Sequence, residues 1–227
     1  MRTLVKSFAS IALLVVLQSL VWAQGPIGYS VTDSTQRLYS IDLSTGRATD
    51  LGAVGTESEL EGLASLEGFL LGVGENDPAR PDLPSAVWNL TPPLPAEEIL
   101  RTGITFGTEI GAAASPVYGR LVGVVASDDT IPAGQIRSRF YVVTETGTTE
   151  FGNGSTTYVD GLAITGDGTI YASDFRISDS LYRLEAPGGV PTLVLVGPLN
   201  IGNPNEDSGL AWDFATGTLW AIEMVAV

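Results

Sequence analysis

The residues of this chain best suited to chemistry are carboxylates that recur at one place in a repeated sequence. They stand just before a short glycine-containing motif, or as its first residue. The set is Glu59, Glu61, Glu109, Asp160, Glu206 and Asp207. Carboxylates held close together repel one another unless one takes up a proton or a cation lies between them. If folding brings these residues together, the sequence predicts a metal site, and calcium is the expected ion because it prefers carboxylate oxygens.

The same residues suit a second kind of chemistry, which is acid–base catalysis on a sugar. Glycoside hydrolysis needs one carboxyl group as acid and another as base or nucleophile, about 5–10 Å apart. Glu61 and Asp160 are the pair expected to act if the protein is such a hydrolase or lyase. A third interpretation stays open, because a chain with 26 acidic residues places some of them near every turn, where they are simply solvated.

The composition excludes several other classes of site. The chain has no histidine and no cysteine, and its single lysine is Lys6. A Ser-His-Asp triad, a zinc–thiolate centre and a thiolate nucleophile are therefore impossible, and beyond the first residues so is a lysine Schiff base. The formal net charge of −15 argues against nucleic acid or an anionic membrane surface as a partner, because both need a positive protein surface.

A repeat of nearly constant length must position these carboxylates. Its glycines, Gly62, Gly111, Gly161 and Gly209, lie 49, 50 and 48 residues apart, a spacing typical of propeller blades or helical arrays. After the first residues no helical periodicity is found. Short apolar strands are instead interrupted by turn residues about every ten positions. The pattern predicts an all-β chain with four antiparallel strands in each repeat, which is the pattern of a β-propeller blade.

The two ends of the chain contain incomplete repeats that complement each other. Residues 27–55 resemble the later part of a repeat, and residues 209–223 supply only its opening. We therefore expect a β-propeller of four blades, with five as the alternative, in which one blade is shared between the N- and C-terminal ends. Because first strands line the axis of a propeller, the carboxylates are expected at one mouth of a central channel. Loops at 75–85 and 128–137 occupy the same place in two repeats, and we expect them to form a binding face.

The chain resembles the secreted bacterial β-propeller repeat proteins of the YVTN/NHL-like kind. Two segments carry the resemblance, RLYSIDLSTGRATDLGAVG (37–55) and GLAWDFATGTLWAI (209–222), which together look like one unit of such a repeat. The resemblance implies the propeller fold. Members of this broad class serve as binding scaffolds, surface proteins or enzymes, so the resemblance does not select an activity.

The first 23 residues are typical of a signal peptide. Arg2 and Lys6 precede an apolar stretch that runs from Ile11 to Trp22, which is short for a membrane span. The sequence thus predicts a signal peptide at 1–23 and a propeller domain at 24–227. The mature protein is expected to be secreted or periplasmic, not inserted in a membrane, and monomeric.

The main expectation for function is an exported, non-catalytic propeller that acts as a binding scaffold for a protein or glycan partner, with calcium as a structural ion. The alternative is a carboxylate-dependent glycoside hydrolase or lyase that acts on carbohydrate, with Glu61 and Asp160 as its catalytic pair. A purely structural envelope protein is the third possibility.

Overall fold

The structure is a computed structural model, and it describes residues 26–32, 35–56, 58–75, 85–118, 122–186, 190–200 and 208–223. The predicted signal peptide at 1–23 lies outside these ranges. Within them, a 3-10 turn at Pro116–Tyr118 accompanies seventeen β-strands, and no helix is long and apolar enough to cross a membrane.

Three sheets have four antiparallel strands each, in chain order from the innermost strand outward. The first contains β4 (Leu60–Leu66), β5 (Phe69–Gly74), β6 (Ala86–Asn89) and β7 (Glu97–Arg101). The second contains β8 (Glu109–Ala114), β9 (Val122–Ser127), β10 (Ser138–Thr144) and β11 (Gly147–Ser155). The third contains β12 (Gly161–Ile164), β13 (Ile170–Asp174), β14 (Ser180–Glu185) and β15 (Thr192–Pro198). Each predicted repeat is therefore one blade.

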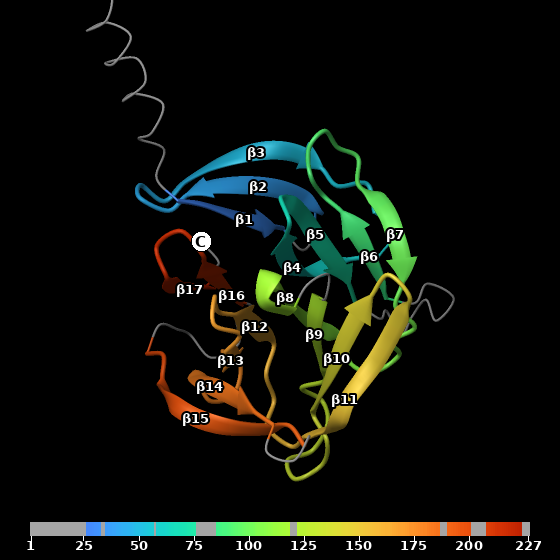
Figure 1. Ribbon diagram of the computed structural model, residues 1–227, viewed down its shortest axis with the longest axis vertical. Helices are drawn as coiled ribbons and strands as arrows, with labels where there is room; N and C mark the ends of the chain where they lie inside the picture. The colour runs from blue at the N-terminus through green and yellow to red at the C-terminus, as the bar shows by residue number, and fades with distance from the viewer. Residues whose placement is uncertain are drawn as a thin grey trace, which may run out of the picture.

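The two ends of the chain fill the remaining arc of the ring (Figure 1). The N-terminal sheet has three strands, β1 (Ile27–Val31), β2 (Arg37–Asp42) and β3 (Arg47–Ala53). The C-terminal sheet has two strands, β16 (Ser208–Asp213) and β17 (Thr218–Glu223). The expected all-β, four-bladed propeller is confirmed. Its closing wedge holds five strands in two sheets that no described hydrogen-bond ladder joins, where the sequence led us to expect one shared sheet.

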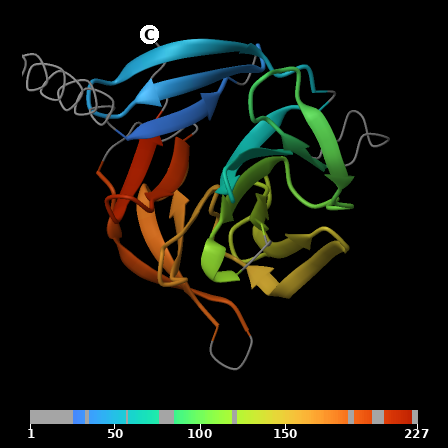
Figure 2. The ribbon, with the colours of Figure 1, turned by 45° about the horizontal axis from the view of Figure 1, so that its top comes forward.

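The first strands of the sheets converge on the axis, as Figures 1 and 2 show. The repeated glycines allow this close approach. A Cβ atom on Gly62 would lie 2.8 Å from the Cβ of Ala112 in the next blade, and one on Gly111 would lie 2.2 Å from the carbonyl oxygen of Asp160. Gly209, in contrast, has no described atom within 4 Å of where its Cβ would lie. The glycines at 62 and 111 thus let adjacent first strands touch.

The apolar core lies between neighbouring sheets. One cluster, which includes Val73, Ile110 and Val124, packs the first four-stranded sheet against the second. A second cluster, centred on Leu38 and Trp88, packs the N-terminal sheet against the first four-stranded sheet, and a third joins the second and third four-stranded sheets. The first and second four-stranded sheets are thus packed on both faces, which fixes their inner strands and the side chains that these strands carry toward the axis.

Candidate functional site

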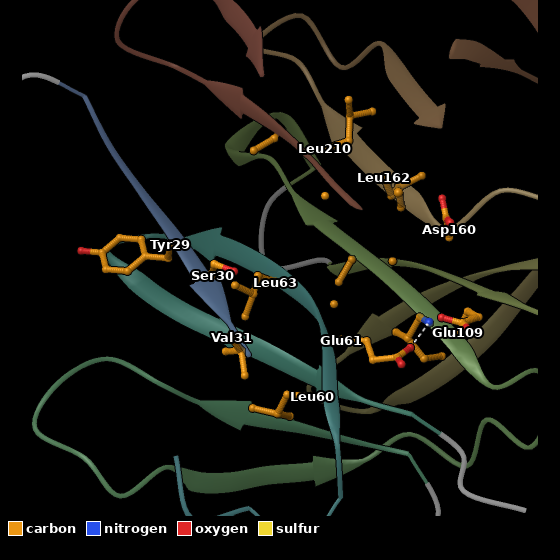
Figure 3. Close-up of a pocket in the computed structure, with 17 residues that line it drawn as sticks. Tyr29, Ser30, Val31, Leu60, Glu61, Leu63, Glu109, Asp160, Leu162 and Leu210 are labelled. Carbon is orange, nitrogen blue, oxygen red and sulfur yellow. Dashed lines mark hydrogen bonds between the residues drawn. The ribbon is translucent and has the colours of Figure 1, made fainter. Parts of the chain in front are cut away.

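A cavity of about 180 Å³ lies on the axis between the first strands of the sheets (Figure 3). β1, β4, β8, β12 and β16 all contribute to its wall. Its acidic lining residues are Glu61, Glu109 and Asp160, which come from three successive four-stranded blades. The cavity therefore gathers equivalent positions of the repeat around one small volume.

The structure brings together three of the six carboxylates that the sequence singled out. Glu61, Glu109 and Asp160 lie toward the same end of the cavity, and Tyr29 lies at the opposite side (Figure 3). Glu59 is half-buried just before β4 and does not line the cavity; its carbonyl oxygen accepts a hydrogen bond from the amide of Glu75 at 2.9 Å. Glu206 and Asp207 lie outside the described residues. The roles assigned to all six remain predictions.

The Glu61 side chain is held against the next blade. Its Oε2 atom accepts a hydrogen bond of 2.9 Å from the backbone amide of Ile110, the second residue of β8. An amide N–H stabilises negative charge on the carboxylate oxygen that it contacts. The bond places the carboxylate of Glu61 next to Glu109 on the adjacent strand (Figure 3).

Arg176 supplies a positive charge that sequence analysis missed. Its Nη1 atom forms an ion pair with Oε1 of Glu109 and a second ion pair, at 3.1 Å, with Oδ2 of Asp129. The side chains of Arg176 and Glu109 are 23% and 16% exposed, so this pair is mostly shielded from solvent. Charge–charge attraction is stronger there than at an open surface. The expected repulsion between carboxylates is therefore relieved at Glu109 by an arginine.

The loop that carries Arg176 is built around one buried carboxylate. Asp174, only 2% exposed, accepts hydrogen bonds from the amides of Ile177 and Ser178, at 2.8 and 3.1 Å, and from the Ser178 hydroxyl at 2.7 Å. These bonds fold the chain after β13 into a tight turn, as aspartate side chains commonly do. The turn fixes the backbone on both sides of Arg176.

The position of this loop in the repeat is the signal that could have identified Arg176. The loop joins the second and third strands of its sheet, and so does the loop with Asp129 in the preceding blade. We predicted a binding face from loops at this place in the repeat, but we considered only the loops at 75–85 and 128–137. At 175–179 the loop is too short to stand out as an insertion.

A buried tyrosine lies in the field of the same charged groups. Tyr158 is 1% exposed, and its hydroxyl has no hydrogen-bond partner in the described structure. Burial raises the pKa of Tyr158 far above its usual range, the charges of Asp160 and Glu109 raise it further, and Arg176 opposes them. Burial and the neighbouring carboxylates thus favour the neutral form of this hydroxyl.

The rest of the cavity wall is largely apolar. Leu63, Leu162 and Leu210 project from three of the first strands, and Tyr29 and Val31 complete this side (Figure 3). A cavity with carboxylates at one end and aliphatic side chains along the rest suits a small ligand that carries its polar groups on one side.

Comparison with known proteins identifies the fold and no closer relationship. No protein-family model matches the chain, and no curated protein matches it in sequence. Among solved structures, a luciferin-regenerating enzyme matches with a TM-score of 0.54 and 13% identity over 85% of this chain. A candidate gluconolactonase matches with a TM-score of 0.53 and 13% identity over 86% of the chain. Regucalcin from Agrobacterium tumefaciens, a calcium-binding protein, matches with a TM-score of 0.51 and 15% identity over 88%.

The chain spans 64%, 70% and 63% of the lengths of these three proteins. At such low identities the likeness shows the fold alone. The resemblance to β-propeller repeat proteins is thereby confirmed at the level of the propeller.

The comparison corrects the main expectation for function. A non-catalytic binding scaffold is contradicted, because the similar propellers named for an activity are an enzyme that regenerates luciferin and a candidate gluconolactonase. The scaffold was favoured because the chain has no histidine or cysteine and no lysine after Lys6, and because a chain of this length leaves little room for a deep sugar-binding pocket. Neither feature removes carboxylate chemistry from the axial cavity.

Proposed function

We propose that the axial cavity is the active site of a carboxylate-dependent hydrolase or lyase that acts on a small carbohydrate. The observation that carries the proposal is the meeting of Glu61, Glu109 and Asp160, from three successive blades, at one end of the cavity. Two carboxyl groups in different surroundings can divide the roles of acid and base between them.

The surroundings suggest how the roles divide. Glu61 receives an amide N–H on Oε2, which stabilises its negative charge and suits the base or nucleophile. Asp160 is then the acid, which protonates the leaving group or returns a proton to the product. Glu109 holds Arg176 and orients it, so we assign it no proton transfer.

The size of the cavity limits the substrate. At about 180 Å³ it lies below the ~300–1,000 Å³ of most ligand pockets. A single sugar ring fits such a volume better than a polymer does. The aliphatic side chains of Leu63, Leu162 and Leu210 would contact the less polar face of the ring.

The comparisons support this choice of chemistry without selecting a substrate. The luciferin-regenerating enzyme and the candidate gluconolactonase share the propeller fold, so small organic substrates are compatible with it. Export through the signal peptide at 1–23 and a monomeric state remain part of the proposal, with the substrate as partner in place of nucleic acid or membrane.

Calcium binding at this site has less support than catalysis. Regucalcin, which shares the fold, is a calcium-binding protein, and carboxylates are ligands that calcium prefers. However, no group of three or more acidic side chains among the described residues is spaced to hold a metal ion. Glu109 is paired with Arg176, and Glu61 with an amide. The described residues do not fit a resident calcium ion, and we derive no step that involves one.

The test is turnover by Glu61→Gln and Asp160→Asn variants. Both replacements keep the size of the side chain. In Glu61→Gln the side-chain carbonyl oxygen can still accept the hydrogen bond from the Ile110 amide. A panel of aryl glycosides and sugar lactones reports hydrolysis, and the absorbance of an unsaturated product reports elimination. We expect kcat to fall by about 10²-fold or more in each variant, because each removes a proton-transfer group.

The matched control is Glu97→Gln, at an exposed position on the outer strand β7. It changes the net charge equally and should leave kcat unchanged. Circular dichroism and the melting temperature, Tm, would show that all three variants are folded. Turnover that survives both cavity substitutions, or no turnover on any substrate of the panel, would contradict the proposal.

A further inference from the structure

We infer that Asn153 is a site of spontaneous covalent modification, at which the side-chain amide is lost and an aspartate or isoaspartate remains. The site lies on β11, the outermost strand of the second four-stranded sheet. No residue of β11 lines the axial cavity. The inference therefore goes beyond the proposed activity and does not depend on it.

Asn153 stands at an irregular place in its strand. β10 and β11 pair in register on both sides of it, but Arg139 alone stands opposite the three residues 152–154. Such a bulge takes residues out of the regular ladder and bends the strand. Asn153 is the middle residue of the three, and its side chain is exposed to solvent.

The side chain of Asn153 is not held in place. Its amide forms no hydrogen bond with the residues that the structure describes. Asn89 differs, because its Oδ1 atom accepts a hydrogen bond of 3.0 Å from the amide of Thr91. The carboxamide of Asn153 is thus free to turn toward the main-chain nitrogen of the next residue.

That next residue is a glycine, and the fold requires it. Gly154 has a φ of +77°, and a Cβ atom there would lie 2.6 Å from Cγ2 of Ile136 and 2.8 Å from the carbonyl oxygen of Ser138. Because glycine has no side chain, its nitrogen is the least hindered that the main chain offers. Asn153 is the only asparagine of the chain that precedes a glycine. The residue that makes the bulge possible therefore also leaves the asparagine open to attack.

The reaction consumes only water. The main-chain nitrogen of Gly154 bonds to the side-chain carbonyl carbon of Asn153, its proton passes to solvent, and the bond from that carbon to Nδ2 breaks to release ammonia. Water then opens the cyclic imide. Opening at the side-chain carbonyl gives aspartate, and opening at the main-chain carbonyl gives isoaspartate. Either product adds a negative charge to a chain whose formal net charge is −15, and nothing is oxidised or reduced.

The experiment follows the folded chain during long incubation at neutral pH and body temperature, in water enriched in heavy oxygen. Peptide mapping by mass spectrometry locates the label that imide hydrolysis leaves behind. We expect label to enter at Asn153 about tenfold or more faster than at Asn200, which is also exposed but precedes a β-branched isoleucine. The half-buried Asn89 should stay unlabelled. An isoaspartate methyltransferase should modify the aged chain and not the fresh one.

Asn153→Gln is the matched variant. Its extra methylene group disfavours formation of the imide, so both the label and the methylation should be lost. Its Tm should equal that of the unmodified protein, because the Asn153 side chain makes no described hydrogen bond. The unmodified chain unfolded in urea shows what the fold contributes, and we expect label at Asn153 in the folded and the unfolded chain alike.

Three results would overturn the inference. They are an absence of label at Asn153, label that enters there no faster than at Asn200, and label at Asn153 confined to the chain unfolded in urea. The last result would mean that the bulge protects the asparagine. Because the readout is mass and not turnover, the outcome is independent of the test of Glu61 and Asp160.

Discussion

At the scale of single residues, the turn aspartates of this protein differ from the axial carboxylates in what they contact. Turn aspartates accept hydrogen bonds from neighbouring amides, as Asp42 does from Ser44 at 2.9 Å and Asp213 from Ala215 at 2.8 Å. The axial carboxylates instead contact neighbouring blades, through Ile110 and Arg176. Some acidic residues thus stabilise turns, whereas Glu61 and Glu109 contact another blade.

Asp167 offers a test of the turn group. Its carboxylate accepts hydrogen bonds from the Thr165 hydroxyl and the Thr169 amide, and these lower its pKa to about 2. An unfolded aspartate has a pKa of about 3.9. Between these values the unfolded chain binds more protons, so stability is lost as the pH falls from about 4 to about 2.

We therefore expect the Tm of the unmodified protein to fall more steeply over this range than that of an Asp167→Asn variant. Thermal unfolding at a series of pH values between about 6 and about 2 would measure the difference. Above about pH 5 the gap in Tm between the two proteins should be constant. Curves that stay parallel throughout the acid range would show that the ionised carboxylate does not stabilise the turn.

At the scale of the element, the first strand of each four-stranded blade, together with the residue just before it, has two tasks. It carries a carboxylate to the axis, and its glycine lets the next first strand approach. The space at Gly111 is closed by the carbonyl oxygen of Asp160, 2.2 Å from where a Cβ would lie, so the glycine and the axial acid depend on the same contact.

This contact predicts different outcomes for the same substitution in two repeats. Gly111→Ala should destabilise the fold by about 1–3 kcal/mol or more, because backbone must move to admit the methyl group. Gly209→Ala, at the equivalent position in the C-terminal repeat, has open space and should change stability by less than about 1 kcal/mol. Urea unfolding of both variants gives the free energies of unfolding, and equal losses would contradict the explanation.

How much the sequence could predict also depends on the element. The blades were predictable because the spacing of Gly62, Gly111 and Gly161 reflects a packing constraint repeated in every blade. Arg176 was not, because its importance comes from contacts with Glu109 and Asp129 in another blade, at separations that no local pattern records. The scaffold expectation was wrong for a related reason: a fold supports many activities, and only the site selects among them.

At the scale of the whole molecule, the dominant feature is charge. The chain has 26 acidic and 11 basic residues, a formal net charge of −15. Repulsion of this kind acts over long distances and opposes the compact state. The exposed ion pairs, such as Arg37–Asp50 at 2.8 Å and Arg101–Glu98 at 2.9 Å, contribute little each.

Because the repulsion from the net charge exceeds the attraction in the exposed ion pairs, we expect salt to stabilise the protein. Raising sodium chloride from about 0.01 M to about 0.15 M shortens the screening length from about 30 Å to about 8 Å. This removes more long-range repulsion than short-range attraction, so Tm should rise. Calorimetry at constant pH would measure the change in Tm with salt concentration. A Tm that falls with salt would mean that the ion pairs outweigh the net charge.

The break between the N-terminal and C-terminal sheets has a consequence for the history of such rings. Each four-stranded blade is fastened to its neighbours by side-chain packing, and the described strands of the two end sheets form no common ladder. A duplicated repeat could enter at that junction without severing a pair of bonded strands. The same holds between any two neighbouring sheets, because no described ladder joins them, so a small ring could grow into a wider one at any of these junctions.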